Sequence, residues 1–163
     1  MSNAAEQAKL EGIGSQIVRL LAGQLVYPCV LLTHTDVRRL RVVSDLLAQR
    51  FDWPELSIGQ RVSAALLGVA PRRWPRLAGQ AMVDAVDSLA PGPILCGDID
   101  LLFEPALELD PLRLLRETSR LASLVVLWPG AYRERVLGYA VPEHAHYRTW
   151  RQTDLCAGCV IPL

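Results

Sequence analysis

Apolar residues fall into two kinds of segment along this chain, continuous runs and amphipathic stretches. Residues 25–33 (LVYPCVLLT) and 123–128 (SLVVLW) are nearly continuous apolar runs. Such runs are typical of strands that are buried on both faces of a parallel sheet. Residues 93–103 (PILCGDIDLLF) contain a third run, which ends in acidic residues, and residues 54–59 (PELSIG) predict a short strand.

Between these runs, apolar residues recur at three- to four-residue spacing and predict helices. The best marked covers residues 36–50, where Asp36 is the expected N-cap. Asp110 followed by Pro111 predicts a second helix start, because proline fits the first turn of a helix. Further helices are expected over residues 4–21, 60–67 and 76–89.

The alternation of strands and helices predicts a three-layer α/β domain around a mostly parallel sheet of about five strands. Residues 135–144 (RVLGYAVPEH) predict the fifth strand, and residues 159–163 (CVIPL) a further one. We expect a single domain over residues 1–163, with an N-terminal helix at 1–23 and a C-terminal tail at 151–163.

Composition narrows the class of protein. Hydrophobic residues make up 51% of the 163-residue chain, which is enough for a proper core. The formal net charge is zero, so no overall field attracts nucleic acid or an anionic membrane. No apolar stretch is long enough to span a bilayer and no secretion signal is present, so we expect a cytoplasmic protein with no membrane contact.

The four cysteines, Cys29, Cys96, Cys156 and Cys159, are expected to be free thiols in that compartment. Cys156 and Cys159 form a lone C-x-x-C, and a zinc site needs two more ligands. We therefore predict no metal site.

The first candidate for chemistry is THTDVRRL, residues 33–40, between an expected strand and an expected helix. A phosphate loop, G-x-x-x-x-G-K-[ST], would lie there. On that frame Thr33 and Arg38 replace the glycines, Arg39 replaces the lysine, and Leu40 replaces the magnesium-binding hydroxyl. An ordinary strand-to-helix turn remains the alternative. The residues at this phosphate-loop position are Thr33, His34, Thr35, Asp36, Arg38 and Arg39.

The second candidate is the acidic end of the third apolar run. Four apolar residues followed by Asp98 and Asp100 resemble a Walker B strand, whose aspartate holds Mg²⁺ through water. Gly97 stands where an acid is expected. A strand end whose carboxylates cap the next turn is the alternative.

Several motifs of the second half resemble the BrxF family of small P-loop proteins from type 3 BREX bacteriophage-exclusion systems. They are an I-[DE]-x-L-F strand end, a D-P-L-x-L-L helix closing in S-R, a W-x-G strand end, and Y-A-x-P-x-H-x-x-Y-R. In this chain they lie at residues 99–103, 110–115 with 119–120, 128–130 and 139–148. The resemblance extends over about residues 25–150.

The resemblance implies an ASCE-type P-loop fold and a role in antiviral defence beside other BREX proteins. Members of the family are expected to carry a glycine-rich G-K-T loop and to bind ATP, and this chain departs from both catalytic elements. We therefore expect ATP and Mg²⁺ to bind weakly at most, with weak or absent hydrolysis. The expected role is an assembly or regulatory partner of a larger BREX ATPase, methyltransferase or phosphatase-like component. Arg120 is a candidate trans arginine in a homo-oligomer, or else a partner for a carboxylate.

Two alternatives stay open. The first is an active small ATPase that uses Arg39 with Asp98 and Asp100. The second is a nucleic-acid-binding adaptor, in which the segment PRRWPR combines arginines with Trp74 for stacking on bases; otherwise DNA contact would be indirect. The arginines proposed for the adaptor are Arg38, Arg39, Arg41, Arg72, Arg73 and Arg76.

Overall fold

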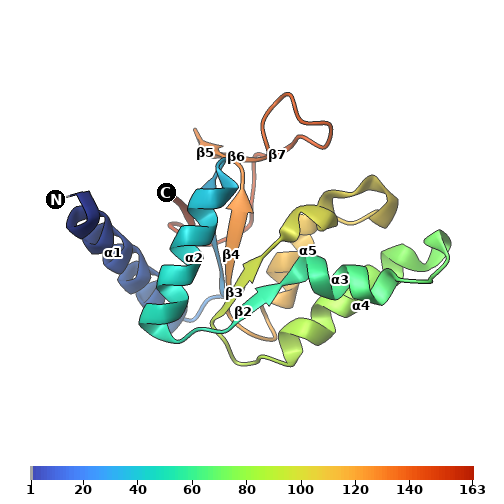
Figure 1. Ribbon diagram of the computed structural model, residues 1–163, viewed down its shortest axis with the longest axis horizontal. Coiled ribbons are helices and arrows are strands. Elements are labelled where there is room, and N and C mark those ends of the chain that lie inside the picture. Colours follow the sequence, from blue (N-terminus) through green and yellow to red (C-terminus); the bar gives the residue numbers. More distant parts are fainter. Residues whose placement is uncertain (1) are drawn as a thin grey trace.

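Five parallel strands form the centre of the molecule. The computed structural model describes residues 2–163, and its main sheet runs through the middle of Figure 1. The strands lie in the order β2-β3-β4-β1-β8, and all four neighbouring pairs are parallel. Their bounds are β1 Cys29–His34, β2 Glu55–Ser57, β3 Ile94–Gly97, β4 Leu124–Pro129 and β8 Val160–Pro162.

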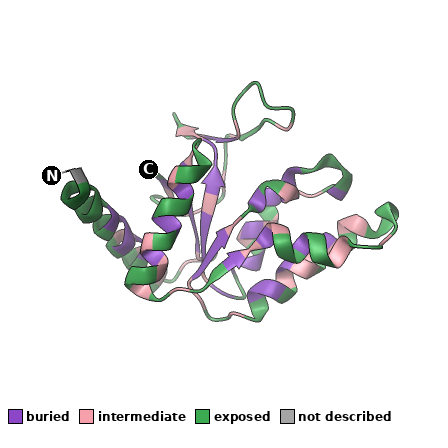
Figure 2. Ribbon diagram, viewed as in Figure 1, coloured by how far each residue is buried: buried purple, intermediate pink, exposed green. Residues whose placement is uncertain are grey.

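Helices cover both faces of this sheet, which confirms the predicted three-layer α/β architecture. Val30 and Leu32 of β1 pack with α1 and α2, whereas Cys29 and Leu31 belong to the core on the opposite face. Figure 2 shows the buried strands between helices whose outer faces are exposed. One face carries α1 Ser2–Ala22 and α2 Val37–Phe51; the other carries α3 Ile58–Leu66, α4 Trp74–Asp87 and α5 Pro111–Thr118.

Side-chain caps fix the starts of three helices. The Asp36 carboxylate accepts a hydrogen bond from the Arg38 N–H at the start of α2, as the sequence predicts. Asp110 caps α5 in the same way. Ser57 caps α3, so this helix begins two residues earlier than predicted. The caps matter because the first N–H groups of a helix have no partner within the helix.

The predicted fifth strand forms, but the prediction that it belongs to the main sheet was wrong. Residues 136–139 form β6 of a separate antiparallel sheet, β5-β6-β7, and the fifth strand of the main sheet is β8 from the predicted tail. The reason is geometric: a parallel crossover needs about a dozen residues or more, and only six separate the end of β4 from β6. The bounds of the small sheet are β5 Tyr132–Arg133, β6 Val136–Tyr139 and β7 Arg148–Trp150.

An aromatic cluster joins the small sheet to the main one. The rings of Phe103 and Tyr139 stack with centroids 3.5 Å apart, and Trp128 and Trp150 pack edge-on beside them. The indole N–H of Trp128 donates to the carbonyl of Gly138 at 2.8 Å. Phe103, Trp128 and Tyr139 each belong to one of the sequence motifs described above, so these motifs meet in space.

Three short 3-10 helices complete the structure: η1 Pro71–Arg73, η2 Ile99–Phe103 and η3 Pro105–Leu107. Over residues 2–163, no helix combines the length and apolar character that crossing a bilayer requires.

Candidate functional site

One hollow of the described surface lies at the carboxyl end of the sheet, where ligands of open α/β folds usually bind. It is a cleft of about 250 Å³ between the first turns of α2 and the ends of β2 and β3. We call it the acidic cleft, because its floor is apolar and its rim is acidic. The floor contains Leu40, Leu56, Leu95 and Leu127, and the rim contains Asp45, Glu55, Asp98 and Asp100 with Arg41.

The connection between β1 and α2 is too short to wrap a phosphate. β1 ends at His34 and α2 begins at Val37, so only Thr35 and Asp36 lie between them. A phosphate loop works because a series of backbone N–H groups surrounds the anion. Here the Asp36 N–H donates to Nδ1 of His34 at 2.8 Å, and the Arg38 N–H donates to the Asp36 carboxylate at 2.9 Å. Two of the available donors are therefore already occupied.

The Asp36 carboxylate also sets the electrostatics of this helix end. A helix N-terminus attracts anions through its free N–H groups and its dipole. A carboxylate held there by the chain itself competes with any phosphate for the same position. Glycine at both loop positions would be needed for backbone wrapping, and Thr33 and Arg38 instead lie in β1 and α2.

Thr33 is buried deep in the sheet. It is 2% exposed, between Trp128 of β4 and Pro162 of β8, and its hydroxyl has no hydrogen-bond partner among the described residues. Strands on both sides cover it, so Thr33 cannot reach a ligand at the sheet edge. Thr35 lies instead at a second hollow, beside the small sheet.

Arg39, at the position of the phosphate-loop lysine, points to another part of the fold. Its guanidinium pairs with Glu6 of α1, with Nη1 and Oε1 3.2 Å apart. Leu40, at the position of the magnesium-binding hydroxyl, forms part of the floor of the acidic cleft. A leucine side chain supplies no ligand for a cation.

Asp98, the first acid of the predicted Walker B-like end, directly follows β3 in a left-handed conformation with φ of +52°. Its carboxylate accepts a hydrogen bond from Ser57 at 2.7 Å and pairs with Arg41 at 3.8 Å. These contacts join the ends of β2 and β3 to α2. The sequence located this acid correctly at a strand end, and its two partners come from elements that sequence reasoning did not place beside it.

Asp100, the second acid, is linked to the small sheet. The phenol of Tyr139 donates to Oδ1 of Asp100 at 2.7 Å. Burial raises the pKa of Tyr139 well above its ordinary value, and the hydrogen bond to Asp100 adds to the shift. The phenol thus remains a donor at neutral pH, and Asp100 is held as its acceptor.

Arg120 lies far from both acids along the sheet. It is exposed, in the turn that precedes β4, whereas Asp98 follows the carboxyl end of β3. Because β3 and β4 are parallel, these positions are at opposite ends of the sheet. Arg120 therefore does not act on the cleft of its own chain, and its role toward a second copy stays a prediction.

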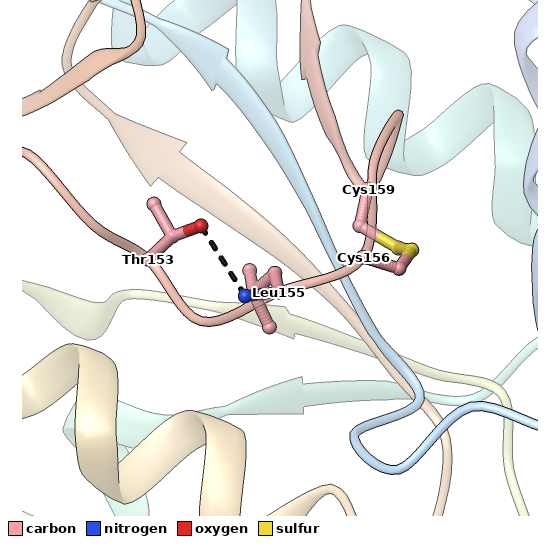
Figure 3. The surroundings of a disulfide bond; sticks show 4 residues. All are labelled: Thr153, Leu155, Cys156 and Cys159. Carbon is pink, nitrogen blue, oxygen red and sulfur yellow. Dashed lines mark hydrogen bonds between the residues drawn. A yellow bond between two sulfur atoms is a disulfide. The ribbon is translucent and has the colours of Figure 1, made fainter.

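The prediction of four free thiols was wrong for two of them. Cys156 and Cys159 form a disulfide, next to a turn in which the Thr153 hydroxyl accepts from the Leu155 N–H (Figure 3). The sequence places them three residues apart, within reach of a disulfide, and the tail folds back onto β1 so that Cys159 is buried. Cys29 and Cys96 are free and buried, as predicted. Among residues 2–163, no group of three or more His, Cys, Asp or Glu is placed to hold a metal ion.

Sequence reasoning missed Arg41, Glu55, Ser57 and Tyr139 as parts of this region. Glu55 accepts from the hydroxyl of the buried Ser44 at 3.0 Å. The sequence does predict a short strand that contains Glu55 and Ser57. Only the strand order, however, shows that the end of this strand lies beside the acidic end of β3.

No protein-family model, curated protein or solved structure matches this chain.

Proposed function

We propose that this protein is a P-loop-like, non-hydrolysing subunit of a BREX-type bacteriophage-defence system in the cytoplasm. It serves as an assembly or regulatory partner of a larger component of that system, of the ATPase, methyltransferase or phosphatase-like kind. The fold supplies a rigid α/β platform, and the nucleotide site of the related P-loop proteins has been lost.

The arrangement of strands supports this proposal. β4 lies between β1, which precedes the phosphate-loop position, and β3, which precedes the acids. A strand inserted at this point is what an ASCE-type P-loop domain is expected to have. The motifs that carry the resemblance also pack together, through Phe103, Trp128 and Tyr139.

The main support for a lost nucleotide site is the connection between β1 and α2, which has only two residues. It offers no loop of N–H groups, the Asp36 carboxylate occupies the start of α2, and the cation at the lysine position, Arg39, pairs with Glu6. The cleft nearby, at about 250 Å³, is below the range of about 300–1,000 Å³ typical of ligand pockets.

The two alternative functions fit the geometry less well. An ATPase built on Arg39 and Asp98 needs both near one phosphate, yet Arg39 turns to α1 while Asp98 pairs with Arg41. A nucleic-acid adaptor would need its arginines on one surface. Arg38, Arg39 and Arg41 lie at the start of α2, whereas Arg72, Arg73 and Arg76 lie at the far end of the α3–α4 pair (Figure 1).

Calorimetric titration of the purified chain with ATP and Mg²⁺ tests the loss of the site. We expect no binding heat and no phosphate release. Micromolar binding with turnover that Arg39→Ala or Asp98→Asn removes would overturn the proposal in favour of the ATPase.

The partnership is tested separately. The chain should co-purify with one of the larger BREX proteins when they are expressed together, and deletion of its gene should reduce protection against phage. Absence of BREX genes from its neighbourhood would contradict the assignment to this system.

A further inference from the structure

The charges of this chain are balanced in number but separated in space. Residues 61–83 contain Arg61, Arg72, Arg73 and Arg76 and not one Asp or Glu. All four arginines are exposed, and within the described residues none pairs with a carboxylate. Arg72, Arg73 and Arg76 belong to η1 and the first turn of α4, at the end of the α3–α4 pair that projects to the right in Figure 1. Arg61 lies in the first turn of α3, at the other end of that helix. Residues 67–76, which contain Leu67 and the other three arginines, are called the basic tip below.

An apolar residue stands at the apex of the basic tip. Leu67, which follows the last turn of α3, is 80% exposed, the highest value among the exposed large hydrophobic residues. Gly68 turns the chain with φ of +69°. An exposed apolar side chain on a segment that also carries exposed arginines suits a contact with protein, in which an apolar anchor is surrounded by a polar rim.

The shape of the basic tip is fixed before any contact. The indole N–H of Trp74 donates to the carbonyl of Val69 at 3.0 Å, and the Val69 N–H donates to the carbonyl of Leu66 at 3.1 Å. Trp74 is half-buried against the core. Its ring is therefore part of the packing rather than a free platform for a base, which weakens the case for nucleic acid at this tip.

The acidic cleft has the complementary character. Its floor is apolar, and its rim has four carboxylates against one arginine, Arg41. Hydrogen bonds from Ser44, Ser57 and Tyr139 hold three of the carboxylates in place. The fourth, Asp45, is exposed and has no partner in the described part of the chain. The salt bridge between Arg41 and Asp98 is open to solvent and weak enough for an incoming guanidinium to replace it.

A chain cannot fill its own acidic cleft with its own basic tip. The cleft begins at Ser57, directly before α3, and α3 carries the tip away from it over nine residues, a span of about 13 Å. The partner that supplies both the leucine and the arginines is available as a second copy.

We propose that the chain self-associates head to tail, with the basic tip of one copy, Leu67 foremost, seated in the acidic cleft of the next. Such a contact joins two different surfaces, so it builds a ring if the rotation closes and an open chain of subunits if it does not. The inference is independent of the proposed role in phage defence.

The test is sedimentation velocity of the full chain over a concentration series, at low and high salt. We expect association that weakens about tenfold between about 0.05 M and 0.5 M NaCl, because salt screens exposed charges. Arg72→Glu with Arg73→Glu should raise the dissociation constant about tenfold or more, as should Asp45→Arg with Glu55→Arg in the cleft. Arg133→Glu with Arg135→Glu, an equal change in charge on exposed residues of the β5–β6 hairpin, should leave association unchanged.

Mixing the tip variant with the cleft variant gives the sharpest result. Each keeps one intact surface, so the mixture should associate more tightly than either variant alone. Circular dichroism of each variant confirms that it is folded. A wild-type chain that remains monomeric at low salt, or a control variant that weakens association equally, would overturn the proposal. So would salt-sensitive binding of duplex DNA that depends on Arg72 and Arg73 in a chain that does not self-associate.

Discussion

At the scale of single residues, two buried thiols give the folded state a dependence on pH. Burial disfavours the thiolate and raises the pKa of Cys29 to about 12, although nearby Arg116 opposes the shift; burial also raises the pKa of Cys96, even further. In the unfolded chain both thiols titrate near about 8.5. Above about pH 8.5 the two thiols lose their protons in the unfolded chain but keep them in the folded chain. The free energy of unfolding is therefore largest below this pH, and it falls as the pH rises toward the pKa values of the folded state.

We predict that the free energy of unfolding falls by up to about 1.4 kcal/mol per pH unit for each thiol in this window. Urea unfolding between about pH 8.5 and 10 measures the slope, with the upper limit chosen because tyrosines begin to titrate there. The variant Cys29→Ala with Cys96→Ala should have a shallower slope. An identical slope in both proteins would mean that the thiols are not responsible.

Gly130, directly after β4, lies in close contact with β6 of the small sheet. A Cβ at Gly130 would collide with the carbonyl oxygen of Gly138, the same oxygen that accepts from Trp128. We predict that Gly130→Ala lowers the free energy of unfolding by roughly 1–3 kcal/mol, because overpacking forces the backbone apart.

The matched control is Gly79→Ala within α4, where an added Cβ meets nothing within 4 Å. There alanine should stabilise the helix by about 0.5–1 kcal/mol. Urea unfolding of both variants measures the contrast, and a loss at Gly79 as large as at Gly130 would contradict the explanation from packing.

At the scale of elements, the short strand β8 directly follows the Cys156–Cys159 disulfide. The strand pairs with β1 through only three residues, and the Cys159 carbonyl just before it accepts from the Leu31 N–H at 2.8 Å. The disulfide restricts the chain leading into that contact. We predict that Cys156→Ala lowers the free energy of unfolding by roughly 2 kcal/mol, the chain-entropy estimate for so short a loop.

Dithiothreitol provides the control for this prediction. It should lower the stability of the wild-type chain to that of the variant and leave the variant unchanged. Equal stability of the oxidised and reduced wild-type chains would show that β8 is held by its packing alone.

Elements that depend on local signals were predictable. The starts of α2 and α5 follow from Asp36 and Asp110, because a cap acts on N–H groups two or three residues away. The sheet to which β6 belongs was not predictable, because its apolar residues suit the buried face of either sheet. Only the short distance from β4 excludes the parallel position.

At the scale of the whole molecule, the layers follow from the sequence but the strand order does not. Apolar runs such as those of β1 and β4 would be buried in any central position, so their pattern leaves the order open. The order in turn decides which strand ends meet. Asp98 was identified from its own strand. Its contacts with Ser57 and Arg41 exist only because β2 lies beside β3 and the first turns of α2 lie next to the ends of both strands.

The sheet has an outer boundary on each side that is short and partly blocked. β2 and β8 have three residues each, β2 follows Pro54, and β8 ends in Pro162, which has no N–H to donate. A long free strand edge would invite another chain to extend the sheet and lead to aggregation. This molecule offers little such edge, so copies that meet must recognise one another through side chains, and changes in surface charge can then adjust their association without disturbing the fold.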